Sequence, residues 1–186
     1  MKALVCSDFG STQDLTLEQR EDLEPGAGEV LIDVKAAGVN FPDILTVEGK
    51  YQFKPELPFI PGTEVSGVVT KLGKGVATRK VGDEVVGMVQ IGGFASQVVT
   101  SEYTTFPKGS SMSYEQAAGF AVTYGTSYYA LKQRAQLQPG ETVLVLGAAG
   151  GVGIATIQIA KAMGATVIAA ASTEEKLYFA CEAGAD

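Results

Sequence analysis

Hydrophobic positions in the first hundred or so residues fall in short runs separated by Gly and Pro. Short apolar runs between turn-forming residues are typical of strands. We therefore expect β-strands at residues 29–36, 66–72, 83–89 and 95–100. This part of the chain predicts a β-rich, barrel-like unit.

The pattern changes near Ser113, where apolar residues take up a helical spacing that ends before Pro139. Beyond it the chain predicts a strand at 142–146 that is buried on both faces, a helix at 154–163, a strand at 166–171 and a helix at 174–183. A buried strand, a crossover helix and a second strand indicate a parallel α/β sheet. Because a dinucleotide-binding fold has two βαβαβ halves, we expect this chain to carry only the first part of one.

A glycine-rich turn lies between the first of these strands and its helix. The dinucleotide fingerprint is GxGxxG, and the corresponding residues are AAGGVG, with Ala148 at the first glycine position. Gly150 would let the backbone approach a pyrophosphate at the helix N-terminus, and Gly153 would let the helix pack closely on the strands. Glycines are common in any α/β turn, but the strand before and the helix after favour a cofactor. The predicted cofactor-binding residues of the turn are Ala149, Gly150, Gly151 and Val152.

The end of the second strand bears on the choice between NADH and NADPH. An acid there would bind the ribose 2′-hydroxyl of NADH and repel a 2′-phosphate, and none occurs before Glu174. Ser172 and Lys176 could instead bind the phosphate, so NADPH is favoured. As an alternative, Ser172 and Thr173 form the N-cap of the last helix and Lys176 is an ordinary exposed lysine. The two interpretations are compatible.

Composition excludes several classes of function. The net charge of −7 comes from 21 acids and 14 bases that interleave without a basic stripe, which argues against nucleic-acid binding. No run of about eighteen apolar residues and no signal peptide are present, so we expect no membrane partner and a cytoplasmic location. With no His and two Cys, a tetrahedral zinc site of nitrogen and sulfur ligands cannot form. Cys6 and Cys181 are expected to be reduced, buried thiols.

Several motifs together with the glycine turn resemble the zinc-free quinone oxidoreductase branch of the medium-chain dehydrogenase/reductase superfamily. They are AAGVNFPDILTVEGKY, PFIPGTEVSGVV, VGDEVVGM and VTYGTSYYAL. The resemblance covers essentially the whole chain. It implies a GroES-like domain at residues 1–122, the first part of a Rossmann NADPH-binding domain at residues 123–186, and a homodimer at full length.

The resemblance also implies an acceptor chemistry. In zinc-bearing alcohol dehydrogenases of the superfamily, a zinc-binding Cys occupies the position of Asn40 and a zinc-binding His that of Thr63, so no metal is expected here. A quinone or an α,β-unsaturated carbonyl can be reduced without the metal that a plain carbonyl uses. It delocalises the incoming negative charge onto an oxygen, which hydrogen-bond donors can stabilise. The resemblance points to Asn40 and Thr126, with Tyr51 nearby, as residues facing the nicotinamide and the acceptor.

Each of these residues has a structural alternative. Asn40 is a good helix cap, Tyr51 is compatible with a packed aromatic role, and the Thr126 hydroxyl is able to bond a nearby carbonyl within its helix. Glu64, which lies near the metal in zinc relatives, is interpreted as structural.

The sequence thus predicts an NADPH-dependent reductase of quinones or enones in which solvent protonates the product. A thioester enoyl reductase is an alternative within the same fold. A non-catalytic nucleotide-binding or interaction protein is the alternative from another class, because fold does not fix function.

Overall fold

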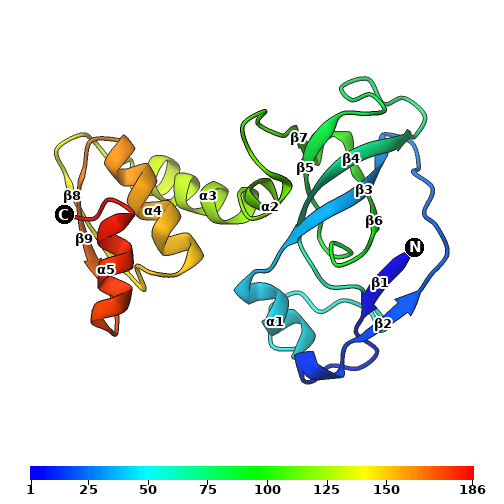
Figure 1. The fold of residues 1–186 in the computed structure, drawn as a ribbon, viewed down its shortest axis with the longest axis horizontal. Coiled ribbons are helices and arrows are strands. Elements are labelled where there is room, and N and C mark those ends of the chain that lie inside the picture. Colours follow the sequence, from blue (N-terminus) through cyan, green and yellow to red (C-terminus); the bar gives the residue numbers. More distant parts are fainter. The chain divides into compact units, whose positions relative to one another are not determined.

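A computed structural model describes all residues from 1 to 186. The chain forms two compact units, Met1–Ala121 and Val122–Asp186. No helix is both long enough and apolar enough to cross a membrane. The first unit is mostly β-structure and the second is α/β (Figure 1).

The first unit contains seven strands, two 3-10 turns and two short α-helices. In chain order they are β1 (Lys2–Val5), a 3-10 turn (Thr12–Asp14), β2 (Thr16–Gln19), β3 (Glu29–Gly38), α1 (Phe41–Val47), β4 (Glu64–Leu72), β5 (Glu84–Met88), β6 (Gln97–Ser101), a 3-10 turn (Glu102–Thr104), β7 (Thr105–Pro107) and α2 (Tyr114–Ala118). The four predicted strands are confirmed as β3, β4, β5 and β6, with ends that differ by at most two residues.

Five of these strands form one antiparallel sheet in the order β6-β3-β4-β5-β7. Strand β3 pairs with β4 on one side and β6 on the other (Figure 1). Alternate side chains point into one core, in which six β-branched residues are almost fully buried. They are Val30, Ile32, Val65, Val69, Val85 and Val98. Burial of each such side chain stabilises the fold by roughly 1.5–3 kcal/mol, so this core holds strands β3, β4, β5 and β6 together.

The second unit begins with helical segments and continues as a strand–helix–strand–helix. Its elements are α3 (Ala121–Tyr128), a π-helix (Tyr129–Arg134), β8 (Thr142–Leu146), α4 (Gly151–Ala162), β9 (Thr166–Ala170) and α5 (Glu174–Glu182). Strands β8 and β9 pair in parallel, as predicted, and the predicted β8 is confirmed residue for residue. Val145, Val167, Ile157 and Ala180 meet in one core between the sheet and its helices.

Three sequence expectations about this unit are wrong. Strand β8 is not buried on both faces, since Leu144 and Leu146 are 59% and 75% exposed; the buried side chains of this sheet all face a single layer of helices. Helix α4 begins at Gly151 rather than at 154, because the turn glycines themselves enter the helix. The thiol of Cys181 is exposed on α5, whereas that of Cys6 is buried as expected.

Candidate functional site

The glycine turn between β8 and α4 is built from backbone alone. Gly147 has a φ of +63°, which favours glycine, and the Gly150 N–H donates to the Gly147 carbonyl at 3.0 Å. Gly150 is the N-cap of α4, and no side chain caps the helix. The first N–H groups of a helix have no partner within it. They therefore present positive partial charge at the exposed residues Gly151 and Val152.

Two glycines of the turn serve different purposes. A Cβ at Gly153 would lie 2.5 Å from the Gly147 oxygen and 2.6 Å from the Ala148 oxygen, so only glycine allows α4 to pack against this turn. At Gly150 the nearest atom to an added Cβ would be the Gly147 oxygen at 3.4 Å, a tolerable contact. The protein itself therefore does not require glycine at position 150, and its lack of a side chain leaves the outer surface of the turn open.

A cavity of about 560 Å³ joins this turn to the end of β9. Its lining residues are Gly147, Ala149, Gly150, Ala170, Ala171, Ser172 and Lys176. No acidic side chain lines it. The structure thus brings together Ala149, Gly150, Ser172 and Lys176 of the predicted cofactor residues, while Gly151 and Val152 begin the adjoining helix.

Ser172 and Lys176 lie side by side at the start of α5. The Lys176 ammonium donates to the Ser172 hydroxyl at 3.4 Å, and both residues are exposed. The N-cap of α5 is Thr173, whose hydroxyl accepts from the Lys176 N–H at 3.3 Å. Thr173 therefore performs the capping, which leaves the Ser172 hydroxyl and the Lys176 ammonium at the cavity.

Hydrogen bonds of the Ser127 and Thr156 hydroxyl groups join helix α3 to the first turns of α4. The Ser127 hydroxyl, fully buried, lies 2.8 Å from the Thr123 carbonyl oxygen and 3.1 Å from that of Val152. Thr156 reaches the same Val152 oxygen at 2.7 Å and Ser127 Oγ at 3.0 Å. Sequence reasoning missed both residues, although serines and threonines in helices commonly bond carbonyls in this way. The neighbouring Thr126, a predicted site residue, is exposed.

In the first unit, Asn40 and Thr63 lie in a polar cluster with two buried acids. Asn40 is the N-cap of α1; its backbone N–H donates to Asp43 Oδ2 at 2.7 Å, and its side-chain amide donates to Glu64 Oε1 at 2.9 Å. The Thr63 hydroxyl donates to Asp43 Oδ1 at 3.4 Å. The capping alternative is thus real, since Asn40 and Asp43 form a capping box at the start of α1, and the amide nitrogen of Asn40 serves a further partner, Glu64.

The two acids differ in surroundings. Asp43 is 4% exposed, and burial raises its pKa above the ordinary value, against the lowering effect of the hydrogen bonds from the Asn40 N–H and the Thr63 hydroxyl. Glu64 is fully buried at the start of β4. No group of three or more His, Cys, Asp or Glu side chains is placed to hold a metal ion.

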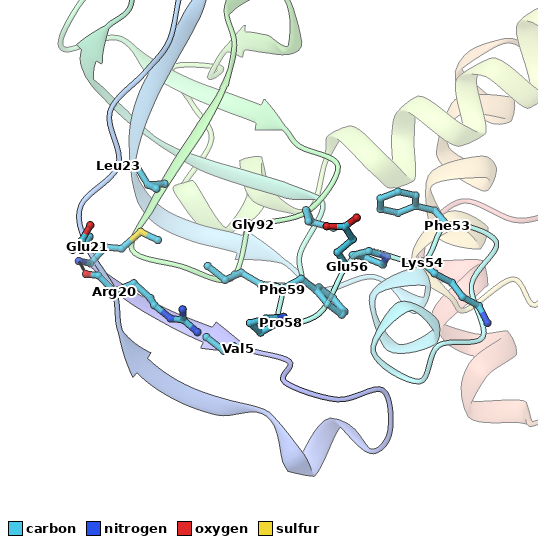
Figure 2. A pocket seen from close by; sticks show the side chains of 14 residues that line it. Val5, Arg20, Glu21, Leu23, Phe53, Lys54, Glu56, Pro58, Phe59 and Gly92 are labelled. Carbon is cyan, nitrogen blue, oxygen red and sulfur yellow. Dashed lines mark hydrogen bonds between the residues drawn. The ribbon is translucent and has the colours of Figure 1, made fainter.

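Tyr51 follows α1, and its backbone N–H donates to the Leu45 oxygen at 3.1 Å. The side chain is half-buried. Figure 2 shows a cavity of about 730 Å³ in the first unit, which is lined by part of the loop that follows Tyr51 but by neither Asn40 nor Tyr51 itself. Arg20 extends along it toward Val5 and Pro58 (Figure 2). Arg20 is paired with Glu18 at 2.8 Å, and charged residues of both signs line the cavity, among them Lys54 and Glu56.

Comparison with known proteins places the chain in a family. The family model described as alcohol dehydrogenase GroES-like domain matches residues 26–130, and that described as zinc-binding dehydrogenase matches residues 151–186. The chain is 42% identical over 186 residues to the quinone oxidoreductase-like protein 2 homolog of Nematostella vectensis, a match that covers 99% of this chain and 50% of that protein. The chain spans about half the length of the curated relatives it matches.

Two solved structures are similar over the whole chain. The quinone oxidoreductase from Thermus thermophilus has a TM-score of 0.89 and 40% identity, covering 100% of this chain and 58% of that one. The Escherichia coli quinone oxidoreductase, solved in complex with NADPH, has a TM-score of 0.95 and 33% identity, covering 100% and 57%. The predicted combination of a GroES-like domain and a Rossmann-like fold is confirmed. The chain therefore belongs to the alcohol dehydrogenase GroES-like family, and the three relatives named here are quinone oxidoreductases or a quinone oxidoreductase-like protein.

Proposed function

We propose that this chain belongs to an NADPH-dependent oxidoreductase that transfers hydride to a quinone or an α,β-unsaturated carbonyl. Residues 123–186 would bind NADPH, and residues 1–122 would contribute to the acceptor site. The observation that carries the proposal is the acid-free cavity that joins the glycine turn to Ser172 and Lys176. Both structural relatives named above have been solved in complex with NADPH, which supports the same cofactor.

The cavity has the features that a phosphorylated dinucleotide requires. The open N-terminus of α4 would bind the pyrophosphate through backbone N–H groups of Gly151 and Val152, with Ala149 and Gly150 beside it. The Lys176 ammonium and the Ser172 hydroxyl would bind the 2′-phosphate by charge-assisted hydrogen bonds. An acid at this place would repel the phosphate, and none lines the cavity.

The hydride chemistry belongs to the bound nicotinamide nucleotide. The protein's own residues would orient the reactants and donate hydrogen bonds to the acceptor oxygen, where negative charge develops. We assign these roles to Asn40, Thr126 and Tyr51. The buried bonds of Ser127 would hold α3, and with it Thr126, firmly against α4. Solvent would protonate the product.

A fluorescence titration of the folded chain with NADPH and, separately, NADH tests the cofactor assignment. We expect NADPH to bind more tightly than NADH. Lys176→Ala should weaken NADPH binding by about tenfold or more, because one charged hydrogen bond is lost, and should leave NADH binding unchanged. Lys161→Ala is a matched control, since Lys161 pairs with Asp186 and does not line the cavity. Binding of neither nucleotide, or equal binding of both, would contradict the assignment.

Acceptor class is tested by following NADPH oxidation in the presence of 1,4-naphthoquinone, a simple enone and a crotonyl thioester. The proposal expects the quinone or the enone to be reduced fastest. A clear preference for the thioester would favour an enoyl reductase instead. NADPH binding without oxidation by any acceptor would favour a non-catalytic nucleotide-binding protein.

A further inference from the structure

Glu64 is a fully buried acid for which the proposed chemistry has no direct use. It is the first residue of β4 and pairs in register with Gly38, the last residue of β3. Asn40 lies two residues beyond that strand end. The sheet therefore places the Glu64 carboxylate beside the Asn40 side chain, where Oε1 accepts from the amide nitrogen at 2.9 Å.

The surroundings of Glu64 are shaped to admit its carboxylate. A Cβ at Gly38 would lie 2.5 Å from Glu64 Oε1 and would overlap the carbonyl oxygen of Ala118, so only glycine leaves room there. Burying an acid is costly unless its hydrogen bonds are satisfied. The fold nevertheless retains Glu64 at this point, with the amide of Asn40 as a hydrogen-bond donor.

We propose that Glu64 is a positioning residue for Asn40. The inference rests on the proposed function, in which Asn40 faces the nicotinamide and the acceptor. Because Glu64 Oε1 accepts from the Asn40 amide nitrogen, this contact holds the amide in the orientation in which its nitrogen faces Glu64. A flipped amide would place two oxygens against each other. One N–H of Asn40 is used by Glu64, and the second remains as a donor in a fixed direction.

Asp43 completes this arrangement from the other side. Its carboxylate accepts the backbone N–H of Asn40 at 2.7 Å and is itself held by the Thr63 hydroxyl at 3.4 Å. Main chain and side chain of Asn40 are thus fixed by different acids. A purely structural Glu64 would stabilise the unit without controlling the amide.

The test is a ¹H–¹⁵N spectrum of the full chain, in which the Asn40 side-chain amide is assigned by its loss in Asn40→Ser. In Glu64→Gln, of nearly equal volume, we expect this amide to shift and to exchange with water about tenfold faster, because the Gln side chain can turn either its oxygen or its nitrogen toward Asn40. Glu102→Gln is the control, since Glu102 is also buried but accepts from Ala77 and Thr78. An amide that keeps its shift and exchange rate in a folded Glu64→Gln chain would overturn the proposal. If Glu64→Gln does not fold, Glu64→Asp, which keeps the carboxyl group but withdraws it by one methylene, is expected to release the same amide.

A kinetic double-mutant cycle supplies the functional readout, with NADPH and 1,4-naphthoquinone as probes. We expect Glu64→Gln to lower the rate at saturating NADPH by up to about 100-fold with unchanged NADPH affinity, because it misplaces a reacting group. The double variant Asn40→Ser/Glu64→Gln should be no slower than Asn40→Ser alone. Losses that multiply would show that Glu64 acts independently of Asn40. If the proposed function fails, the wild-type chain binds no NADPH; the amide spectrum needs no nucleotide, so the two failures are distinguishable.

Discussion

The two units build polar sites in opposite ways. The glycine turn of the second unit offers main-chain N–H groups and depends on missing side chains, whereas the cluster around Asn40 in the first unit is made of side chains that already bond one another. The first arrangement is suited to a ligand, since the leading N–H groups of a helix have no partner within it. The second is suited to holding one amide still. In the second unit, adding a side chain to the turn should therefore disturb ligand binding, whereas in the first unit, removing a side chain should disturb the hydrogen bonds around Asn40.

Gly153→Ala should have the largest effect on the second unit. The added methyl would lie 2.5 Å from the Gly147 oxygen, and the backbone cannot yield as a side chain would. We expect the free energy of unfolding to fall by about 2–3 kcal/mol, with loss of NADPH binding. Denaturant unfolding and the NADPH titration measure both. A Gly153→Ala variant of wild-type stability would mean that the turn is looser than described.

Gly150→Ala sharpens the comparison, because here the new methyl meets the protein only at 3.4 Å. Stability should stay within about 0.5 kcal/mol of wild type. NADPH affinity should nevertheless fall by about tenfold or more, since the methyl occupies the space through which the pyrophosphate approaches. Unchanged NADPH affinity in Gly150→Ala would show that the dinucleotide does not bind against this turn.

Two adjacent residues of α3 provide the next contrast. Ser127→Ala should reduce the free energy of unfolding by about 1–2 kcal/mol, because the Thr156 hydroxyl loses a partner. Thr126→Ala, at an exposed position, should change stability by less than about 0.5 kcal/mol while slowing reduction of the acceptor. Equal stabilities of the two variants would argue against the fastening of α3 to α4.

Asp43→Asn is expected to change the free energy of unfolding least, and the change depends on pH. Burial raises the pKa of Asp43 in the folded state above its ordinary 3.8, so with rising pH the unfolded chain releases this proton first. Asp43 therefore costs no stability below 3.8, and its cost appears as the pH rises from there through its folded-state pKa. Asp43→Asn should be slightly more stable than wild type at neutral pH and not in acid.

Glu102→Gln should show the opposite dependence. The hydrogen bonds from the Thr78 hydroxyl and N–H and from the Ala77 N–H lower the pKa of Glu102, so its contribution is present above the ordinary 4.5 and is lost as the pH falls through the folded-state pKa. The variant should therefore be destabilised mainly at neutral pH. Urea unfolding of Asp43→Asn and Glu102→Gln across a range of pH measures how the stability difference from wild type changes with pH, and the two variants should differ in its direction.

The sequence predicts those features that depend on local pattern. Strands β3 to β6, the parallel β8–β9 pair and the turn between them follow from apolar runs and glycine spacing, and α5 begins where the polar run at Ser172 and Thr173 indicates. The end of β9 also lacks an acid in the sequence itself, so the cavity chemistry at Ser172 and Lys176 was predictable. Whether NADPH occupies that cavity stays a prediction.

Features that depend on contacts between residues far apart in the sequence could not be predicted from the pattern of apolar and polar positions. The sequence alone assigns Glu64 only a structural role, because its bond to Asn40 joins residues 24 apart, and the Ser127–Thr156 contact joins residues 29 apart. The exposed face of β8 is also missed, because an apolar run does not reveal how many helical layers cover a strand. The roles of Asn40, Tyr51 and Thr126 remain predictions.

The most direct test of the central claim is to follow the backbone amide signals of the ¹⁵N-labelled chain as NADPH is added. We expect the signals of Gly150, Gly151 and Val152 to move together with those of Ser172 and Lys176 when NADPH is added, and NADH to move the first group more than the second. Shifts confined to other parts of the chain, or no shifts in a folded chain, would contradict that claim.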